Sequence, residues 1–271
     1  MCTSFLANNS RIAFENRKGD TMRKTICILS VVLVLGVFVY TLTEVRAQAP
    51  VPKDQPILSQ LLFREDFKAG KEHEVQFTQD LLTNPNLELK KYGPGAKPGV
   101  SDQSGILISN EGDPATGKMQ TLVWTGVVQG PWAVMFKDKN NYLDLRNTAH
   151  VHWRTRPRAF KELRLVVKLA DGTMLASDRS EPVSTYSHES EVFFTDILLW
   201  RPINPETMME AKPKPGAGQF VYLPDLSKVD EIGFTDLGPG AGHGAVGGNV
   251  AIDWMEVYGQ PVKRTAQTSA R

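Results

Sequence analysis

Two histidines separated by one residue, His150 and His152, have a spacing that could support chemistry. Successive side chains of a strand alternate between its two faces, so both imidazoles would lie on one face, close enough to share a metal ion. Arg154, Arg156 and Arg158 follow at every second position. Cations beside a metal site weaken metal binding by direct repulsion. The pattern therefore favours solvent-facing histidines over a catalytic metal centre.

The histidines also belong to a predicted basic surface. Residues 149–156 and 162–169 are predicted to pair as an antiparallel hairpin in which Trp153 lies opposite Leu165, because this register places the apolar side chains on one face. The other face would then hold His150, His152, Arg154, Arg164 and Lys168. Arginine binds carboxylate and sulfate through two parallel hydrogen bonds, so this face predicts an acidic polysaccharide as ligand. Neutralisation by acidic residues on neighbouring strands is the alternative.

The tryptophans are a second set of candidate ligand contacts, because aromatic rings stack on the apolar faces of sugars. They are Trp124, Trp132, Trp153, Trp200 and Trp254. The hairpin pairing assigns Trp153 to the core. Trp124 and Trp132 flank the turn at residues 129–131, and this position favours their exposure over that of the others.

The sequence holds no motif of an established enzyme class. Residues 242–247 satisfy the spacing G-x-G-x-x-G, but a predicted strand follows where a dinucleotide site needs a helix. This segment is instead interpreted as an end loop, with His243 as a candidate ligand contact. G-x-S-x-G, H-E-x-x-H and P-loop patterns are absent, so no catalytic residue is assigned.

Composition limits the classes of function. The 271 residues are 41% hydrophobic and 23% charged, which is typical of a globular protein. Residues 48–271 hold 25 basic and 27 acidic residues, and this near-neutral balance gives no reason to expect nucleic acid as partner. Both cysteines, Cys2 and Cys27, precede this segment, which excludes disulfides and thiolate metal sites within it.

The first 47 residues have the order of an export signal. Arg23 and Lys24 precede the apolar run 26–40, and small residues follow as far as Ala47. This order predicts a signal-peptide helix cleaved after Ala47, and a mature protein that is secreted or lies in the periplasm or cell envelope, outside the membrane itself. A single uncleaved membrane anchor is the alternative. Met22 is an alternative to Met1 as the start.

The remaining chain is predicted to be all-β. Short apolar or alternating runs punctuated by Gly, Pro, Asn and Asp indicate a sandwich or barrel. Strands are predicted at 61–67, 86–92, 105–110, 119–126, 132–138, 142–156, 162–169, 173–179, 191–200, 229–236 and 249–259. The dipeptide Asp171-Gly172 predicts a hairpin turn. The predicted organisation is a leader at 1–47, a proline-rich linker at 48–60, one domain at 61–260 and a polar tail at 261–271.

Three segments resemble the galactose-binding-like jelly rolls, which include many noncatalytic carbohydrate-binding modules. They are Leu62–Phe67 (LFREDF), Val229–Phe234 (VDEIGF) and the closing Val250–Gly259 (VAIDWMEVYG). The resemblance is a pattern of strands across residues 61–260. It implies a jelly-roll β-sandwich of two antiparallel sheets, and a fold alone does not determine a function.

The same resemblance implies a structural calcium ion where the first and last strands meet. Glu65, Asp66 and Asp253 occupy the matching acidic positions. Oxygen ligands from carboxylates suit calcium, and solvated charges at strand ends are the alternative.

The sequence thus predicts a secreted, noncatalytic β-sandwich that binds a glycan, with an acidic polysaccharide as the expected class. A polysaccharide lyase or glycosidase on the same fold, with His150 or His152 as base, is one alternative. A structural or adhesive envelope protein is another.

Overall fold

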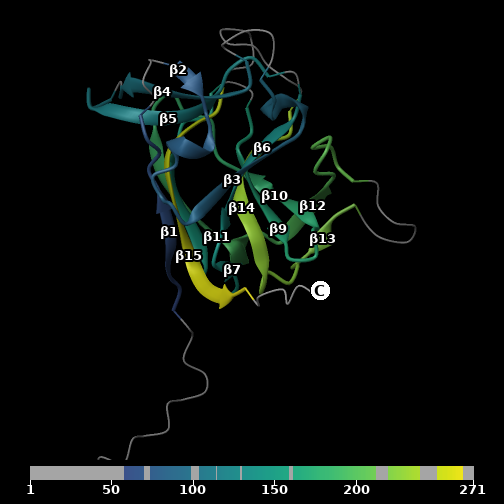
Figure 1. Ribbon diagram of the computed structural model, residues 1–271. Coiled ribbons are helices and arrows are strands. Elements are labelled where there is room, and N and C mark those ends of the chain that lie inside the picture. Colours follow the sequence, from purple (N-terminus) through teal and green to yellow (C-terminus); the bar gives the residue numbers. More distant parts are fainter. Residues whose placement is uncertain are drawn as a thin grey trace, which may run out of the picture. The chain divides into compact units, whose positions relative to one another are not determined.

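The computed structural model describes residues 58–69, 74–98, 104–113, 115–128, 130–158, 161–211, 219–238 and 249–264. Within these ranges the chain forms fifteen strands and three short 3-10 turns, and every pair of named strands is antiparallel (Figure 1). None of the helical turns in these ranges has the length and apolar character needed to cross a membrane. The predicted signal peptide, most of the predicted linker, His243 and the last seven residues lie outside the described residues.

The strands form two sheets, so the predicted all-β sandwich is confirmed. Sheet A contains β1 (Gln60–Glu65), β2 (Glu74–Gln76), β4 (Ile106–Gly112), β5 (Met119–Thr125), β8 (His150–Thr155), β11 (His188–Phe193) and β15 (Ala251–Lys263). Sheet B contains β3 (Leu87–Tyr92), β6 (Trp132–Asp138), β7 (Asn141–Asp144), β9 (Arg164–Leu169), β10 (Met174–Ser180), β12 (Leu199–Ile203), β13 (Val221–Tyr222) and β14 (Val229–Asp236). The 3-10 turns are η1 (Gln79–Leu81), η2 (Pro94–Ala96) and η3 (Phe194–Asp196).

Strand β15 joins the two sheets. Its first part pairs with β1, β5 and β8 of sheet A, and its last four residues, from Gln260 on, pair with β7 of sheet B. Gly259 lies at this transition, where a Cβ atom would stand 2.6 Å from the carbonyl oxygen of Asp144. Glycine is required there because only a residue without a side chain permits so close a backbone approach. Strand β15 continues to Lys263, so the strand end predicted at residue 259 is slightly early.

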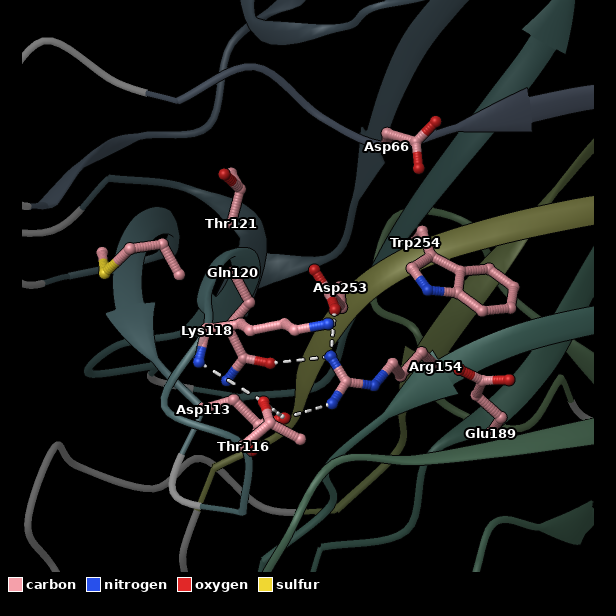
Figure 2. A pocket seen from close by; sticks show the side chains of 11 residues that line it. Asp66, Asp113, Thr116, Lys118, Gln120, Thr121, Arg154, Glu189, Asp253 and Trp254 are labelled. Atoms are coloured by element: carbon pink, nitrogen blue, oxygen red, sulfur yellow. Dashed lines mark hydrogen bonds and ion pairs between the residues drawn. The ribbon is translucent and has the colours of Figure 1, made fainter.

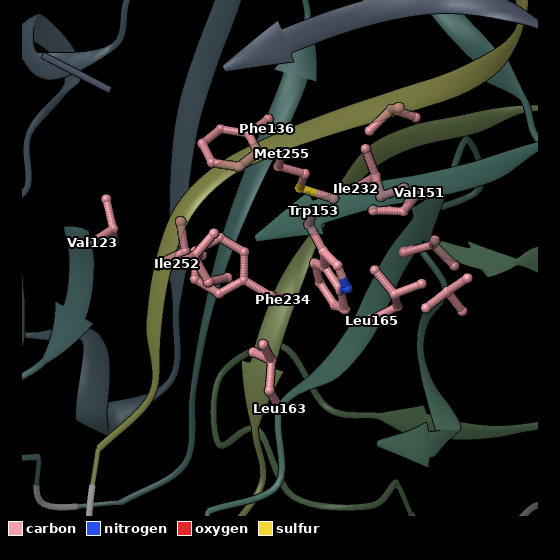
Figure 3. Close-up of a cluster of buried hydrophobic side chains, with 14 of the residues drawn as sticks. Val123, Phe136, Val151, Trp153, Leu163, Leu165, Ile232, Phe234, Ile252 and Met255 are labelled. Atoms are coloured by element: carbon pink, nitrogen blue, oxygen red, sulfur yellow. The ribbon is translucent and has the colours of Figure 1, made fainter. Parts of the chain in front are cut away.

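The core lies between the two sheets and is rich in aromatic residues. Trp153 of β8 and Met255 of β15 in sheet A belong to the same buried cluster as Leu165 of β9 and Phe234 of β14 in sheet B (Figure 3). Phe234 packs against Phe136 with ring centroids 6.1 Å apart. Each such side chain contributes roughly 1.5–3 kcal/mol by leaving water, so this cluster accounts for the stability of a domain without disulfides.

The predicted hairpin between 149–156 and 162–169 is wrong. Strand β8 pairs with β11 and β15 in sheet A, whereas β9 pairs with β10 and β14 in sheet B. Trp153 and Leu165 are nevertheless both buried in one cluster, because they meet across the sandwich rather than side by side in a sheet. Alternation identifies the buried face of a strand, and it does not identify the strand's partner.

The strand positions themselves agree with the sequence pattern. The predicted hairpin turn at Asp171-Gly172 connects β9 to β10, and Gly172 has a φ of +89°. The predicted run 142–156 is divided into β7 and β8, and 191–200 into β11 and β12. Two very short strands, β2 and β13, were not predicted, because two or three residues are too few to show a period.

Candidate functional site

A β-bulge in β15 builds the most distinctive surface of the molecule. Ile252 pairs with Thr155 and Trp254 with Arg154, so Asp253 is the extra residue between two consecutive pairs. Such an insertion interrupts the alternation of side chains, which places both Asp253 and Trp254 outside the sandwich. Beyond the bulge, Met255 and Val257 are buried and their neighbours face outward.

Cross-strand pairing arranges the outward side chains of β1, β15, β8 and β11 in three rows. We call this surface the outer face of sheet A. The first row contains Tyr258, His150 and Phe193, the second Arg64, Glu256, His152 and Glu191, and the third Trp254, Arg154 and Glu189. Side chains that lie opposite one another on adjacent strands are close enough to interact directly. The face therefore presents aromatic and charged groups in fixed order.

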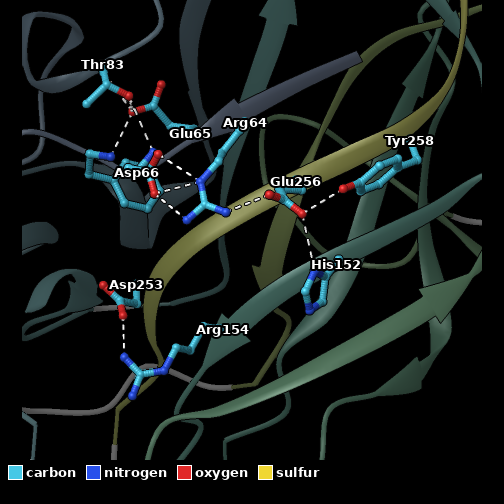
Figure 4. Close-up of polar contacts among 10 residues, drawn as sticks. Arg64, Glu65, Asp66, Thr83, His152, Arg154, Asp253, Glu256 and Tyr258 are labelled. Carbon is cyan, nitrogen blue, oxygen red and sulfur yellow. Dashed lines mark hydrogen bonds and ion pairs between the residues drawn. The ribbon is translucent and has the colours of Figure 1, made fainter. Parts of the chain in front are cut away.

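Glu256 is the centre of the second row (Figure 4). It accepts hydrogen bonds from Arg64 at 2.6 Å and from the hydroxyl of Tyr258 at 2.9 Å, and its Oε2 lies 3.2 Å from Nδ1 of His152. Burial alone would raise the pKa of the Glu256 carboxyl, but these hydrogen bonds outweigh burial and lower it. Glu256 is thus held ionised and fixed in position.

The aromatic rings of this face are also held by neighbours. The guanidinium of Arg64 lies 4.6 Å from the ring centre of Trp254, and His152 meets the same indole edge-on at 4.7 Å. His150 stacks on Tyr258 with ring centres 4.4 Å apart. These contacts fix the orientation of each ring before any ligand arrives, which lowers the entropy lost on binding.

A cavity of about 390 Å³ opens beside Trp254 (Figure 2). It is lined by Asp66, Asp113, Thr116, Lys118, Met119, Gln120, Thr121, Arg154, Glu189, Asp253 and Trp254. Arg154 donates hydrogen bonds to Asp113 and Asp253, both at 2.5 Å, and to Oε1 of Gln120 at 3.0 Å. Burial raises the pKa of Asp253 despite its hydrogen bond with Arg154, and the nearby carboxylates of Asp66 and Asp113 add to the rise.

The predicted basic surface does not exist as one face. His150, His152 and Arg154 lie together on the outer face of sheet A, whereas Arg164 and Lys168 belong to sheet B. Arg164 pairs with Glu162, and Lys168 lies 3.1 Å from Glu231. The predicted surface is divided because β8 and β9 are not neighbouring strands. Arg164 and Lys168 are paired with acidic residues, as the alternative prediction of neutralisation stated.

The predicted exposure of Trp124 and Trp132 is also wrong. Trp124 is 3% exposed and Trp132 is 1% exposed. Trp132 packs in the core against Phe234, with ring centres 5.9 Å apart. Trp132 points into the core between the sheets, whereas Trp124 is buried in a separate cluster with Leu107, Leu122 and Ala251. His243, the remaining predicted ligand contact, lies outside the described residues.

The three acidic residues matched to a calcium site bind protein groups instead. Glu65 is buried and accepts hydrogen bonds from Thr83 and from the backbone N–H groups of Phe67 and Asn84. Asp66 pairs with Arg64, and Asp253 pairs with Arg154. In the part of the chain that the structure describes, no group of three or more His, Cys, Asp or Glu residues could hold a metal ion. Calcium binding at these residues stays a prediction.

Glu256, Tyr258 and Gln120 are candidate site residues that the sequence prediction did not name, and Trp254 was named only as one of the five tryptophans. Period-two alternation in the closing segment could have placed Trp254, Glu256 and Tyr258 on one face. That signal was available in the sequence. Gln120 carried no such signal, because its role depends on the pairing of β5 with β15 and of β15 with β8.

Comparison with known proteins gives matches in structure only. No family model matches the chain, and no curated protein matches its sequence. A family 11 carbohydrate-binding module from a cellulosomal cellulase of Clostridium thermocellum is 14% identical, with 74% of this chain and 95% of that one covered at a TM-score of 0.39. A mutant family 29 carbohydrate-binding module in complex with mannohexaose is 9% identical, covering 73% and 92% at 0.32.

An inactivated mutant of β-agarase B in complex with agaro-octaose is 12% identical, covering 80% of this chain and 99% of that one at a TM-score of 0.34. These similar structures include the class of module that the strand pattern resembles. With TM-scores this low, they assign neither a ligand nor a site to this chain.

Proposed function

We propose that this domain binds a glycan on the outer face of sheet A and that the cavity beside Trp254 is the centre of the binding site. The observation that carries the proposal is the composition of the cavity wall. One indole stands beside planar polar side chains, namely the guanidinium of Arg154, the amide of Gln120 and the carboxylates of Asp113 and Asp253. Small-molecule sites are concave and combine aromatic surface with a few fixed polar groups, and this volume is within their usual range.

Sugars suit such a wall for a chemical reason. A pyranose offers an apolar face to an aromatic ring and hydroxyl groups to planar donors and acceptors at its rim. Trp254 and Tyr258 lie four residues apart on the outer side of β15, which separates them by roughly 14 Å along the strand. A glycan chain lying along β15 would therefore contact both rings.

We propose binding without catalysis. Hydrolysis of a glycosidic bond needs one protonated and one ionised carboxyl on opposite sides of the bond. The polar groups of this face are instead engaged with one another, as Glu256 is with Arg64, Tyr258 and His152. Release of reducing ends or unsaturated products from a bound polysaccharide would replace this proposal with the glycosidase or lyase alternative.

Affinity electrophoresis of the full chain tests the proposal. The gels would contain mixed-linkage β-glucan, mannan, agarose or polygalacturonate. We expect retardation by at least one polysaccharide, loss of that retardation in Trp254→Ala, and a normal result for Tyr222→Ala, whose ring is 64% exposed on strand β13 of sheet B. Equal retardation of parent and Trp254→Ala would overturn the placement of the site. Retardation by none of the four polysaccharides would overturn glycan binding.

We also propose that the domain is exported. The order of Arg23 and Lys24, the apolar run and Ala47 supports cleavage after Ala47. Mass spectrometry of the envelope and secreted fractions should then find a chain that begins at Gln48. Recovery of uncleaved chain from the membrane fraction would support the anchor alternative.

A further inference from the structure

The amide nitrogen of Gln120, in the cavity wall, is a hydrogen-bond donor without a protein partner among the described residues. Gln120 is only 6% exposed, and its Oε1 accepts hydrogen bonds from Arg154 at 3.0 Å and Ser187 at 3.3 Å. These two donors fix which end of the amide is oxygen. The amide nitrogen, Nε2, is buried and makes no hydrogen bond within the described part of the chain. Buried donors are rarely left unpaired, so this group indicates an acceptor supplied by a ligand.

The guanidinium groups of the face, in contrast, are already engaged. Arg154 is held by Asp113, Asp253 and Gln120. Arg64 is held by both oxygens of Asp66 and by Glu256. Each arginine already directs three of its five N–H groups at protein acceptors, so a carboxylate or sulfate would meet a guanidinium whose charge is largely compensated.

The charge of the cavity also disfavours anions. Its wall carries four carboxylates, on Asp66, Asp113, Asp253 and Glu189, against the two cations Lys118 and Arg154. Negative groups on a ligand would be repelled by this excess. The raised pKa of Asp253, caused first by burial and then by its carboxylate neighbours, reports the same excess of negative charge.

This inference rests on the proposed glycan-binding function. We infer that the cavity recognises an uncharged sugar through one hydroxyl group, which accepts a hydrogen bond from Nε2–H of Gln120 and donates one to the carboxylate of Asp253. The amide of Gln120 and the carboxylate of Asp253 are neighbours, because Oε1 of Gln120 and Oδ2 of Asp253 both accept hydrogen bonds from Nη1 of Arg154. A hydroxyl can donate and accept at once. The carboxylate of a uronate or a sulfate group cannot donate to Asp253, and an ammonium group cannot accept from Gln120, so none of these charged groups can replace the hydroxyl. A negative group elsewhere on the sugar would be repelled by the four carboxylates of the wall, so the site selects neutral sugars over anionic ones.

Calorimetric titration of the full chain tests the selection. The neutral probes are mixed-linkage β-glucan, mannan and agarose oligosaccharides, and the anionic probes are oligogalacturonate and chondroitin sulfate. We expect a neutral probe to bind at least about tenfold more tightly than either anionic probe. Added NaCl should leave the affinity for the neutral probe unchanged, because no ion pair forms with it.

The variant Gln120→Glu tests the role of the amide. It keeps the side-chain shape, removes the donor and should weaken binding of the neutral probe about tenfold. Gln260→Glu makes the same chemical change at a half-buried position of β15, where the amide donates to the backbone of Leu58, and it should bind as the parent does. Melting curves of both variants establish that they fold. Gln120→Met, which also lacks the donor, repeats the test without adding a carboxylate.

The outcomes separate the two proposals. Absence of binding to every neutral and charged probe overturns the proposed function. Tighter binding of oligogalacturonate or chondroitin sulfate overturns the selection of neutral over anionic sugars while glycan binding stands. Unchanged affinity in folded Gln120→Glu and Gln120→Met overturns the role of the amide.

Discussion

The outer faces of the two sheets have opposite characters. On sheet B, Met208 is fully buried and packs with Ala133, Met135, Val166 and Ala176 as a second hydrophobic cluster on that side of the sheet. Met208 lies in the segment after β12 and has a φ of +55°, and Gly93 leaves room for it, since a Cβ there would stand 2.4 Å from the Met208 side chain. On sheet A, charged and aromatic side chains remain partly exposed around a cavity.

A cavity of comparable volume, about 400 Å³, also opens beside Met208 and Leu237, so the two faces differ in the setting of their polar groups rather than in shape. Both faces contain cations paired with carboxylates, but on sheet B the carboxylate of Glu231 is almost fully buried with Lys168 and the hydroxyl of Tyr92. Burial raises the pKa of Tyr92 to about 12. The carboxylate of Glu231 adds to this rise, and Lys168 opposes it. Glu231 is buried with its partners on sheet B, whereas His152 and Glu189 are partly exposed on the outer face of sheet A, where we propose that the ligand binds.

Removing one methionine from each face should give the largest contrast. Met208→Ala should lower the free energy of unfolding by about 2–5 kcal/mol, because it leaves a cavity in a packed cluster. Met119→Ala, at a position of sheet A that is 72% exposed, should change it by less than about 0.5 kcal/mol. Urea denaturation measures both. Comparable losses in the two variants would show that the faces do not differ in packing.

Neutralising one carboxylate on each face should give a smaller contrast. Glu231→Gln leaves Lys168 without its charged partner in a largely buried setting, and we expect a loss of about 2 kcal/mol. Glu191→Gln breaks a half-exposed pair with His150, for which about 0–1 kcal/mol is expected. The comparison fails if Glu191→Gln proves the more damaging change in urea denaturation.

The pH dependence of stability should have opposite signs at two aspartates. Burial alone would raise the pKa of Asp230 in sheet B, but hydrogen bonds from Arg264 and Lys137 lower it. Its contribution is therefore present above the unfolded-state pKa of about 3.9 and is lost as the pH falls through the lower folded value. Asp253 has a raised pKa, so its ionisation lowers stability as the pH rises through that value.

Melting temperatures of the parent, Asp230→Asn and Asp253→Asn across acid pH test these signs. The advantage of the parent over Asp230→Asn should shrink on acidification below about pH 4. Relative to Asp253→Asn, the parent should instead gain stability on acidification. The same direction of change for both variants would contradict the contrast.

Local sequence pattern predicted the fold class and most strands, because alternation and turn residues act within a few positions. It also identified the buried faces of β8 and β9, where Trp153 and Leu165 belong to the core. Strand partners could not be predicted from alternation, so His152 and Lys168 were assigned to one surface although they lie in different sheets. The bulge at Asp253 was likewise invisible, since it appears only when β15 is aligned with β8.

The account depends most on the claim that ligand binds beside Trp254, and indole N–H resonances test it directly. Isotope-labelled full-length protein would be titrated with the neutral oligosaccharide that binds best, and Trp254→Phe would assign the key signal. We expect the Trp254 resonance to shift on binding, while that of Trp200, whose indole donates to the carbonyl of Ile197 in the core, stays in place. A stationary Trp254 indole resonance, together with shifts of the backbone N–H resonances of Met209 or Tyr222, would place the ligand on sheet B and contradict the account.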